Sequence, residues 1–242
     1  MSEEKDEHVP AGATEIELRN VAGSIEISGS GSAAAIAVHS VKTAPFQAAL
    51  DNVRVEIQKE GNRLIIAEKH DQGFLTQTGT VSFRVVVPKG MTVIDAHSVS
   101  GGITVRGVEP GIDQNLSTIS GGIATERARS LDASSTSGSI HFTSRGPALT
   151  VRSVSGSIDG VIESLGTGGT AHIGTVSGSV SLEVFAGLDA RVSLHSLSGQ
   201  VSCSFPVTVS EQKNNRLIGT IGRGSADLDV GTISGSISIS KM

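Results

Sequence analysis

An all-β solenoid, in which a β-helix coils through rungs of about 20 residues, is the fold class that this 242-residue sequence predicts. Three observations predict it. A Ser-Gly phrase recurs at nearly regular intervals, and apolar residues alternate with polar ones beside each copy. The composition combines 30 glycines with six prolines and no Trp or Tyr, so small β-branched side chains must fill a narrow core.

Each copy of the phrase is anchored by a glycine, which follows a serine in all but the early, atypical copy. The anchoring glycines are Gly23 in that early copy and then Gly101, Gly121, Gly138, Gly156, Gly178, Gly199 and Gly235. From Gly101 onward they are 20, 17, 18, 22, 21 and 36 residues apart, so the last gap is close to twice the others. We predict that each glycine occupies either a corner where the backbone crowds the axis of the coil or a turn that requires a positive φ.

Four columns of the repeat are mostly apolar: those five and two residues before the glycine, and those two and four residues after it. Alternation with period two predicts that the two later columns fill one strand face inside the coil. The two earlier columns are three residues apart, so a bend or bulge is needed to keep both inside. We expect both of these columns to lie inside the coil. The column two residues before the glycine holds Val99, Ile119, Thr136, Val154, Val176, Leu197 and Ile233. The single cysteine, Cys203, falls in an inward column and is predicted to be a small buried hydrophobe.

Two hydroxyl columns, three residues and one residue before the glycine, are the candidate binding surface. Stacked rungs would align them as ladders on a regular, weakly charged face. Hydrogen bonds from these hydroxyls to neighbouring turns are the simpler alternative. The candidate residues are Ser98, Ser100, Thr118, Ser120, Ser153, Ser155, Thr175, Ser177, Ser196, Ser198, Thr232 and Ser234, with Ser135 and Ser137 in the same columns. The array resembles the Thr-x-Thr faces of ice-binding β-helices, although few of its members are Thr.

The chain divides into three regions. Residues 1–13 are acidic and are predicted to be a disordered N-terminus. Residues 14–90 are predicted to form an early rung and a capping β-meander, with strands at 36–41, 53–58, 63–68 and 80–87 and one helical turn within 44–51. Residues 91–242 hold the repeats, and an irregular insertion near 204–218 is expected to form a hairpin. Little chain follows the last rung, so we expect it to leave an open strand edge that favours self-association.

Charge and hydropathy exclude several partners. The formal net charge of −5, with few aromatic residues, argues against nucleic acid and against anionic membrane surfaces. No apolar run approaches a membrane span, and residues 1–10 do not resemble a signal peptide. The chain as written is therefore expected to be cytoplasmic, and to belong to the cell envelope or surface if a leader was removed.

The sequence offers no convergent catalytic or metal-binding constellation, so we predict no enzyme, no metal and no cofactor. His97 and His195 occupy equivalent columns, but the rungs between them place them too far apart to share a metal ion. His172 lies in another column. Asp227 and Asp229 share one strand face, where a spacing of two residues is typical of solvated charge.

The early rung Asn20–Ile27, the segment Val85–Gly90 and the Ser/Thr-hydrophobic-Ser-Gly-Gly/Ser-Ile repeats resemble the bacterial β-repeat proteins of the DUF4097 type, known as putative adhesins. The resemblance covers residues 14 to 242 and implies a β-helical, envelope-associated protein without known chemistry. The expected function is a non-enzymatic interaction or adhesin-like module that binds a protein or a glycan. The alternatives are a scaffold that stacks end to end through open rungs, and an ice-binding or polysaccharide-active β-helix.

Overall fold

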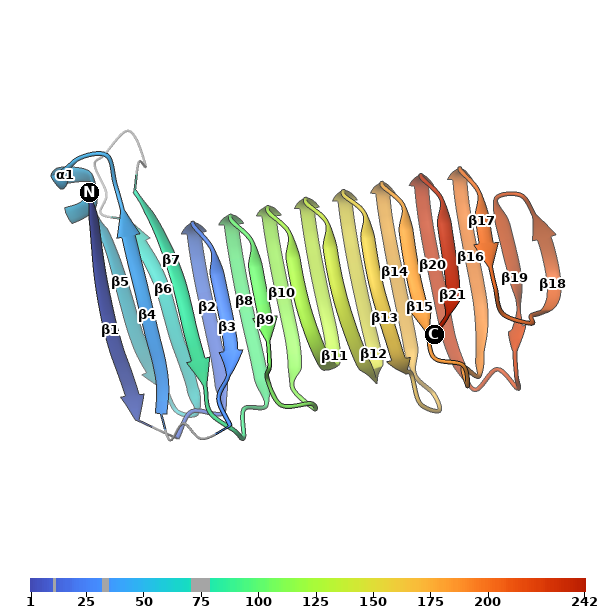
Figure 1. Cartoon of the computed structure of the whole chain (residues 1–242), viewed down its shortest axis with the longest axis horizontal. Coiled ribbons are helices and arrows are strands. Elements are labelled where there is room, and N and C mark those ends of the chain that lie inside the picture. The colour runs from blue at the N-terminus through green and yellow to red at the C-terminus, as the bar shows by residue number, and fades with distance from the viewer. Residues whose placement is uncertain (11, 32–34, 71–78) are drawn as a thin grey trace.

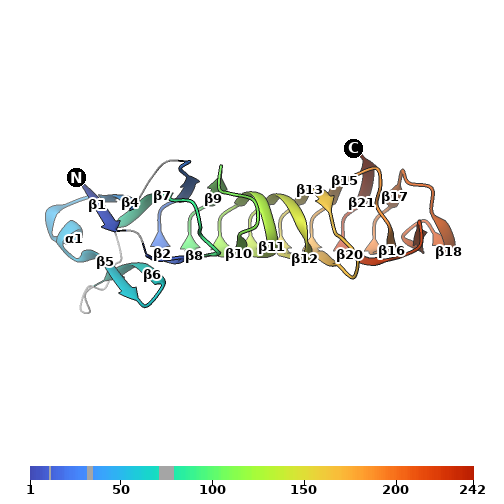
Figure 2. The same cartoon turned by 90° about the horizontal axis from the view of Figure 1, so that it is seen from below.

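The computed structural model describes residues 1–10, 12–31, 35–70 and 79–242, and it confirms an all-β solenoid. The rungs stack into a long, flattened coil with two strand layers, shown from the side in Figure 1 and from below in Figure 2. We call these layers face A and face B, since each rung gives one strand to each. Neighbouring rungs pair in parallel, so the backbone of every internal strand is hydrogen-bonded on both sides.

Face A consists of the first strand of each rung. In the order of stacking, its strands are β2 (Glu15–Ala22), β8 (Val93–Ser100), β10 (Asp113–Ser120), the second halves of β11 (Ile123–Ser137) and β12 (Ile140–Ser155), β14 (Thr170–Ser177), β20 (Ala226–Ser234) and β16 (Ala190–Ser198). Face B consists of the second strands. They are β3 (Ile25–Gly29), β9 (Ile103–Arg106), the first halves of β11 and β12, β13 (Ile158–Ser164), β15 (Val180–Val184), β21 (Ile237–Lys241) and β17 (Val201–Cys203).

Three of the four apolar columns lie inside, as the alternation predicts. Column five before the glycine is buried throughout, with Leu116 and Val151 fully inaccessible. Columns two and four after it supply the facing layer, for example Ile158 and Leu182. Cys203 lies in the last of these columns near the end of the coil, where it is half-buried, and burial raises the pKa of its thiol.

The column two residues before the glycine was predicted inside, and that prediction is wrong. Val99, Ile119, Val154, Val176, Leu197 and Ile233 are exposed, with exposed fractions between 43% and 75%. The hydroxyl column immediately before it lies inside instead, so the alternation of the first strand continues unbroken to the turn. The inward positions of the first strand, five and three residues before the glycine, are two residues apart, so the strand needs no bulge. The alternation changes phase only at the turn between the two faces.

The inward hydroxyls bond the backbone of the neighbouring rung. Thr175 Oγ1 donates to the carbonyl of Gly156 at 3.0 Å, and Ser196 Oγ donates to the carbonyl of Gly235 at 2.8 Å. The same bond is made by Thr118, Ser135, Ser153 and Thr232. These side chains are about 5% exposed or less, so their hydroxyls satisfy the turn carbonyls and do not form an external ladder.

The anchoring glycines allow the turns to stack in close contact. A Cβ at Gly101 would stand 2.0 Å from the carbonyl oxygen of Gly23, and one at Gly156 would stand 2.2 Å from that of Gly138. No side chain fits at such a distance. The crowding is between the backbones of successive rungs, and not against the axis of the coil.

The rungs do not stack in the order of the sequence. The last rung of the chain, β20–β21, lies between the β14–β15 and β16–β17 rungs (Figure 1). The chain first builds the β16–β17 rung one position further out and then returns to fill the gap. The C-terminus therefore ends inside the row of strands, and the prediction that the last rung leaves an open edge is wrong.

The Asp189 carboxylate is hydrogen-bonded to the loop that leads into this inserted rung. Asp189, just before β16, accepts backbone N–H bonds from Arg223 and Gly224, both at 2.6 Å, and from Ser225 at 3.2 Å. Partial burial raises the pKa of the Asp189 carboxyl, but these bonds and one from the Ser225 hydroxyl outweigh it and hold the pKa below its ordinary value of 3.8. The loop that leads into β20 is thus tied to the start of β16.

We expect Asp189 to contribute to stability in a pH-dependent way. Because its folded pKa is lowered, the contribution is fully present above pH 3.8 and is lost as the pH falls through the folded pKa. The free energy of unfolding of Asp189→Asn should therefore lie below that of the parent chain at neutral pH, and the two should converge in acid. Denaturant titrations from pH 7 down to pH 2.5 measure this difference. A gap that stays constant over that range would contradict the prediction.

Both ends of the coil are covered. At the N-terminal end, β6 (Arg63–His70) and β5 (Val53–Glu60) extend face A, while β7 (Thr80–Val87), β4 (Ala35–Thr43) and β1 (Ser2–Pro10) extend face B. A short helix, α1 (Gln47–Asp51), lies where a helical turn was expected. The predicted disorder of residues 1–13 is wrong for Ser2–Pro10, because β1 pairs with β4 along its whole length.

At the C-terminal end, β19 (Arg216–Ile221) and β18 (Thr208–Lys213) form a hairpin that pairs antiparallel with β16. This confirms the hairpin expected near 204–218 and covers the outer edge of face A. Among the described residues, the structure contains no helix with the length and apolar character that crossing a membrane requires.

Candidate functional site

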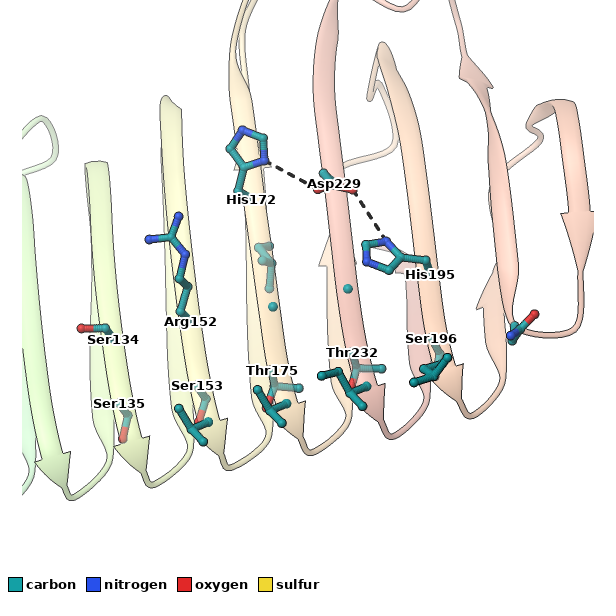
Figure 3. A pocket seen from close by; sticks show the side chains of 18 of the residues that line it. Ser134, Ser135, Arg152, Ser153, His172, Thr175, His195, Ser196, Asp229 and Thr232 are labelled. Atoms are coloured by element: carbon teal, nitrogen blue, oxygen red, sulfur yellow. Dashed lines mark ion pairs between the residues drawn. The ribbon is translucent and has the colours of Figure 1, made fainter.

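A groove of about 1090 Å³ runs across the C-terminal half of face A. Its lining extends from Thr118 on β10 and Ser134–Thr136 on β11, across β12, β14, β20 and β16, to the β18–β19 hairpin. Figure 3 shows the side chains that line it. Its long direction follows the axis of the solenoid, perpendicular to the strands.

The floor of the groove is low because two neighbouring strands carry glycine at the same level. Gly174 on β14 pairs with Gly231 on β20, and Arg152 on β12 pairs with Gly174 on its other side. The His195 ring leans over Gly231, since a Cβ there would lie 2.6 Å from its Nε2 atom. A Cβ at Gly174 would meet only the Gly231 carbonyl, at 3.5 Å. The space above Gly174 is therefore open.

One rim of the groove is apolar. It is formed by Val154, Val176, Ile233 and Leu197, which are the exposed members of the column that the sequence had placed inside. The same column continues through Thr136 to Ile119 and Val99 along the turn between the two faces, and we call its exposed apolar residues the apolar ladder. Ladder residues on adjacent rungs stack on one another at strand spacing, about 4.8 Å, which stabilises the coil. A continuous apolar line beside a groove is also typical of an interaction surface.

The opposite wall is polar and joins three strands. The Asp229 carboxylate on β20 lies between His172 on β14 and His195 on β16, with Nδ1 to oxygen distances of 3.8 and 3.9 Å (Figure 3). These distances exceed hydrogen-bond length, so the contacts are electrostatic. The sequence analysis missed this cluster because it placed the three residues on rungs in chain order. Insertion of β20 brings Asp229 between the two imidazoles.

Cations stand at two places in the groove, on β12 and at the hairpin end. Arg152 is exposed, and no hydrogen bond or ion pair involves its guanidinium anywhere in the described part of the chain. At the hairpin end, Lys213 and Arg216 share one acid, Glu211, at 2.8 and 3.3 Å. A hydrogen bond from Lys213, together with the Arg216 charge, holds the pKa of Glu211 below its ordinary value. The groove thus offers positive charge on β12 and at the hairpin end, and one carboxylate in its wall.

The cluster is not arranged for nucleophilic catalysis. Ser196 and Thr232 follow closely on the wall residues in sequence, but their hydroxyls lie inside and are bonded to turn carbonyls. A nucleophile would have to lie within hydrogen-bond reach of an imidazole on the outer surface. Over the ranges that the structure describes, no three His, Cys, Asp or Glu side chains come together in a way that could hold a metal ion.

The hydroxyl ladders proposed as a binding surface are divided between inside and outside. The serines directly before each glycine, such as Ser155 and Ser177, are exposed beside the apolar ladder. The hydroxyls three residues before the glycine are buried, so the two columns do not share one external face. This removes the flat double file of hydroxyls on which the ice-binding interpretation rested.

A capped, two-faced β-solenoid with a lateral groove is the class of protein that this fold and site define. The chain belongs to the Toastrack DUF4097 family, whose family model matches residues 76–240. This confirms the resemblance seen in the repeats. No curated protein matches the chain.

Several solved structures are similar to the chain. A putative cell adhesion protein of Clostridium sporogenes is 11% identical, with each chain fully covered and a TM-score of 0.44. A putative adhesin of Parabacteroides distasonis is 12% identical over 99% of this chain and 97% of its own, with a TM-score of 0.38. A putative lipid binding protein of the same species is 12% identical over 100% and 96%, with a TM-score of 0.32. These scores are too low to carry an argument about the site.

Proposed function

We propose that this protein is a non-enzymatic, adhesin-like binding module of the bacterial cell envelope, and that the groove on face A is its contact surface. The observation that carries the proposal is the coincidence of an exposed apolar ladder with the one stretch of face A where two glycines lower the floor. The apolar rim, the polar wall, the Arg152 charge and the charged hairpin end together offer the mixed surface that a protein or glycan partner requires.

Binding without chemistry fits the residues of the groove. The hydroxyls of Ser196 and Thr232 bond turn carbonyls, and the Asp229 carboxylate lies 3.8 and 3.9 Å from two imidazoles. Rigid strands hold every side chain of the wall, since β14, β20 and β16 are each paired on both sides. A preorganised surface of this kind loses little conformational freedom when a partner binds.

End-to-end stacking is the less well supported alternative. It requires open rungs, but the hairpin β18–β19 covers the outer strand of face A, and the outer strand of face B, β17, is only three residues long. At the other end, β1 and β5 are antiparallel edge strands. We expect monomeric particles in light scattering at high protein concentration. Filaments that lengthen with concentration would favour the scaffold.

Filling the groove at Gly174 should abolish binding while leaving the fold intact. In Gly174→Val the new side chain projects into the open space above the floor, and valine suits a strand better than glycine. The free energy of unfolding should be unchanged or up to about 1 kcal/mol higher. The measurement is co-sedimentation of the purified chain with isolated bacterial envelopes, compared with the parent chain.

The matched control for Gly174→Val is Ser238→Val, which adds a comparable side chain to an exposed position of β21 on face B. We expect this control to sediment like the parent. Equal retention of Gly174→Val and the parent chain by the envelopes would show that the groove is not the contact surface. No retention of any variant would contradict the envelope-binding role itself.

A further inference from the structure

We propose that the groove binds a linear acidic polysaccharide, laid along the solenoid axis with its carboxylates directed at Arg152 and at the hairpin end. This inference rests on the proposed function and names the class of its partner. Three features of the groove support this inference: the backbone of its floor is already hydrogen-bonded, one side is apolar and the other polar, and its cations are spaced along its length.

The floor disfavours an extended peptide. Peptides that add to sheets bind through their main chain, but the backbone groups of β12, β14, β20 and β16 are already paired within the parallel sheet. A ligand that crosses these strands finds hydrogen-bond partners only on side chains. A sugar chain can bind through side chains alone, because its hydroxyls and carboxylates project from the chain and can reach them.

The two sides of the groove match the two kinds of surface on a pyranose ring. The apolar rim, with Val176 and Ile233 at its centre, offers aliphatic contact to C–H groups. The facing wall offers an acceptor in Asp229 and imidazole nitrogens in His172 and His195, all at the surface and able to bond hydroxyls. No Trp or Tyr is present to stack on a sugar, so the ladder takes the place of an aromatic platform.

The charges select an acidic chain over a neutral one. The Arg152 guanidinium has no partner among the described residues, and Arg152 lies beside Gly174 in the sheet. A guanidinium binds a carboxylate through two parallel hydrogen bonds, which fixes the ligand as well as attracting it. Lys213 and Arg216 bring two cations against the single charge of Glu211 at the other end. Negative groups at intervals along one sugar chain would meet Arg152 and the cations of the hairpin end.

The spacing of the groove suits a repeating ligand. Its walls present one side chain per strand, at intervals of about 4.8 Å. One residue of an extended sugar chain is of similar length, so successive sugars would meet equivalent positions on successive strands. An acyl chain would leave the polar wall formed by His172 and Asp229 without partners, and desolvating such groups without compensation is unfavourable.

Calorimetric titration of the full chain with hexagalacturonate tests the inference, with a neutral galactose hexamer as the comparison ligand. We expect the acidic hexamer to bind and added salt to weaken it. We expect Arg152→Gln to lower the affinity by about tenfold, the effect of one charge-assisted pair, and Gly174→Val to abolish binding. Arg145→Gln removes an exposed arginine from the same strand, β12, outside the groove, and should bind like the parent.

Two outcomes would overturn the inference: no binding of the acidic hexamer at millimolar concentration, or equal affinity for both hexamers. An unchanged affinity in Arg152→Gln would overturn the assigned role of that arginine. The envelope sedimentation experiment separates these results from failure of the proposed function. If envelopes retain the parent but not Gly174→Val, while the hexamer does not bind, the groove is a binding surface for a different partner.

Discussion

Deleting residues 226–242 is expected to unfold the C-terminal third of the solenoid, although these residues are the last of the chain. They form β20 and β21, which pair with rungs on both sides. Their loss removes the fully buried side chains of Leu228, Val230, Ile237 and Ile239, each worth about 1.5–3 kcal/mol. The sum is comparable to the whole stability of a typical domain, about 5–15 kcal/mol. The neighbouring strands β14 and β16 would lose their partners as well.

Limited proteolysis and hydrogen exchange measure this effect. In the truncated chain we expect cleavage and rapid exchange throughout residues 165–225, with protection retained near the N-terminal end. The control is deletion of residues 1–10, which removes β1, an edge strand paired only with β4 in the described structure. That deletion should leave most of the coil protected. Loss of a single terminal rung in the C-terminal deletion would contradict the insertion.

Replacing Gly101 by alanine should destabilise the protein by about 2–4 kcal/mol, while the same change at its neighbour should be nearly neutral. At Gly101 the added Cβ would stand 2.0 Å from the backbone of the adjacent rung, and φ is +154°, a conformation that side chains rarely adopt. At Gly102 the nearest atom is 3.4 Å away. Urea titrations of Gly101→Ala and Gly102→Ala provide the comparison, with the second variant as the control for the alanine itself.

Equal stability of these two variants would contradict the close stacking of the turns. A loss at Gly102 alone would place the crowding one residue further along the chain. Either result would require a different path for the backbone between face A and face B, and hence a different position for the apolar ladder.

The sequence predicted the interior of the coil better than its surface. In the columns that contain Leu116 and Ile158, apolar residues alternate with polar ones along the strand. This period-2 pattern places all the apolar residues on one face of the strand, which predicts that they are buried. The column of Val154 is equally apolar, but the competing inward position belongs to Ser153, whose hydroxyl bonds a turn carbonyl. Hydrophobicity alone does not reveal that a small hydroxyl side chain has a backbone partner in the next rung.

The groove could not be predicted because it depends on the order of the rungs. Nearly identical repeats pair equally well with one another, so their sequence does not say which rungs are neighbours. The gap of 36 residues between Gly199 and Gly235 was the only sign of an irregular path. Placing β20 between β14 and β16 aligns Gly174 with Gly231 and gathers the two imidazoles around Asp229.

Disulfide formation between introduced cysteines tests the inserted rung most directly. In a Cys203→Ser background, Ser181→Cys combined with Ser238→Cys should crosslink on mild oxidation, since these residues are direct partners on β15 and β21. Ser181→Cys combined with Ser202→Cys should not, because β21 separates the two strands by about 9.6 Å, beyond the ~7 Å limit of a disulfide. Ready crosslinking of positions 181 and 202, with none between 181 and 238, would show that the rungs follow chain order and would contradict the groove as described.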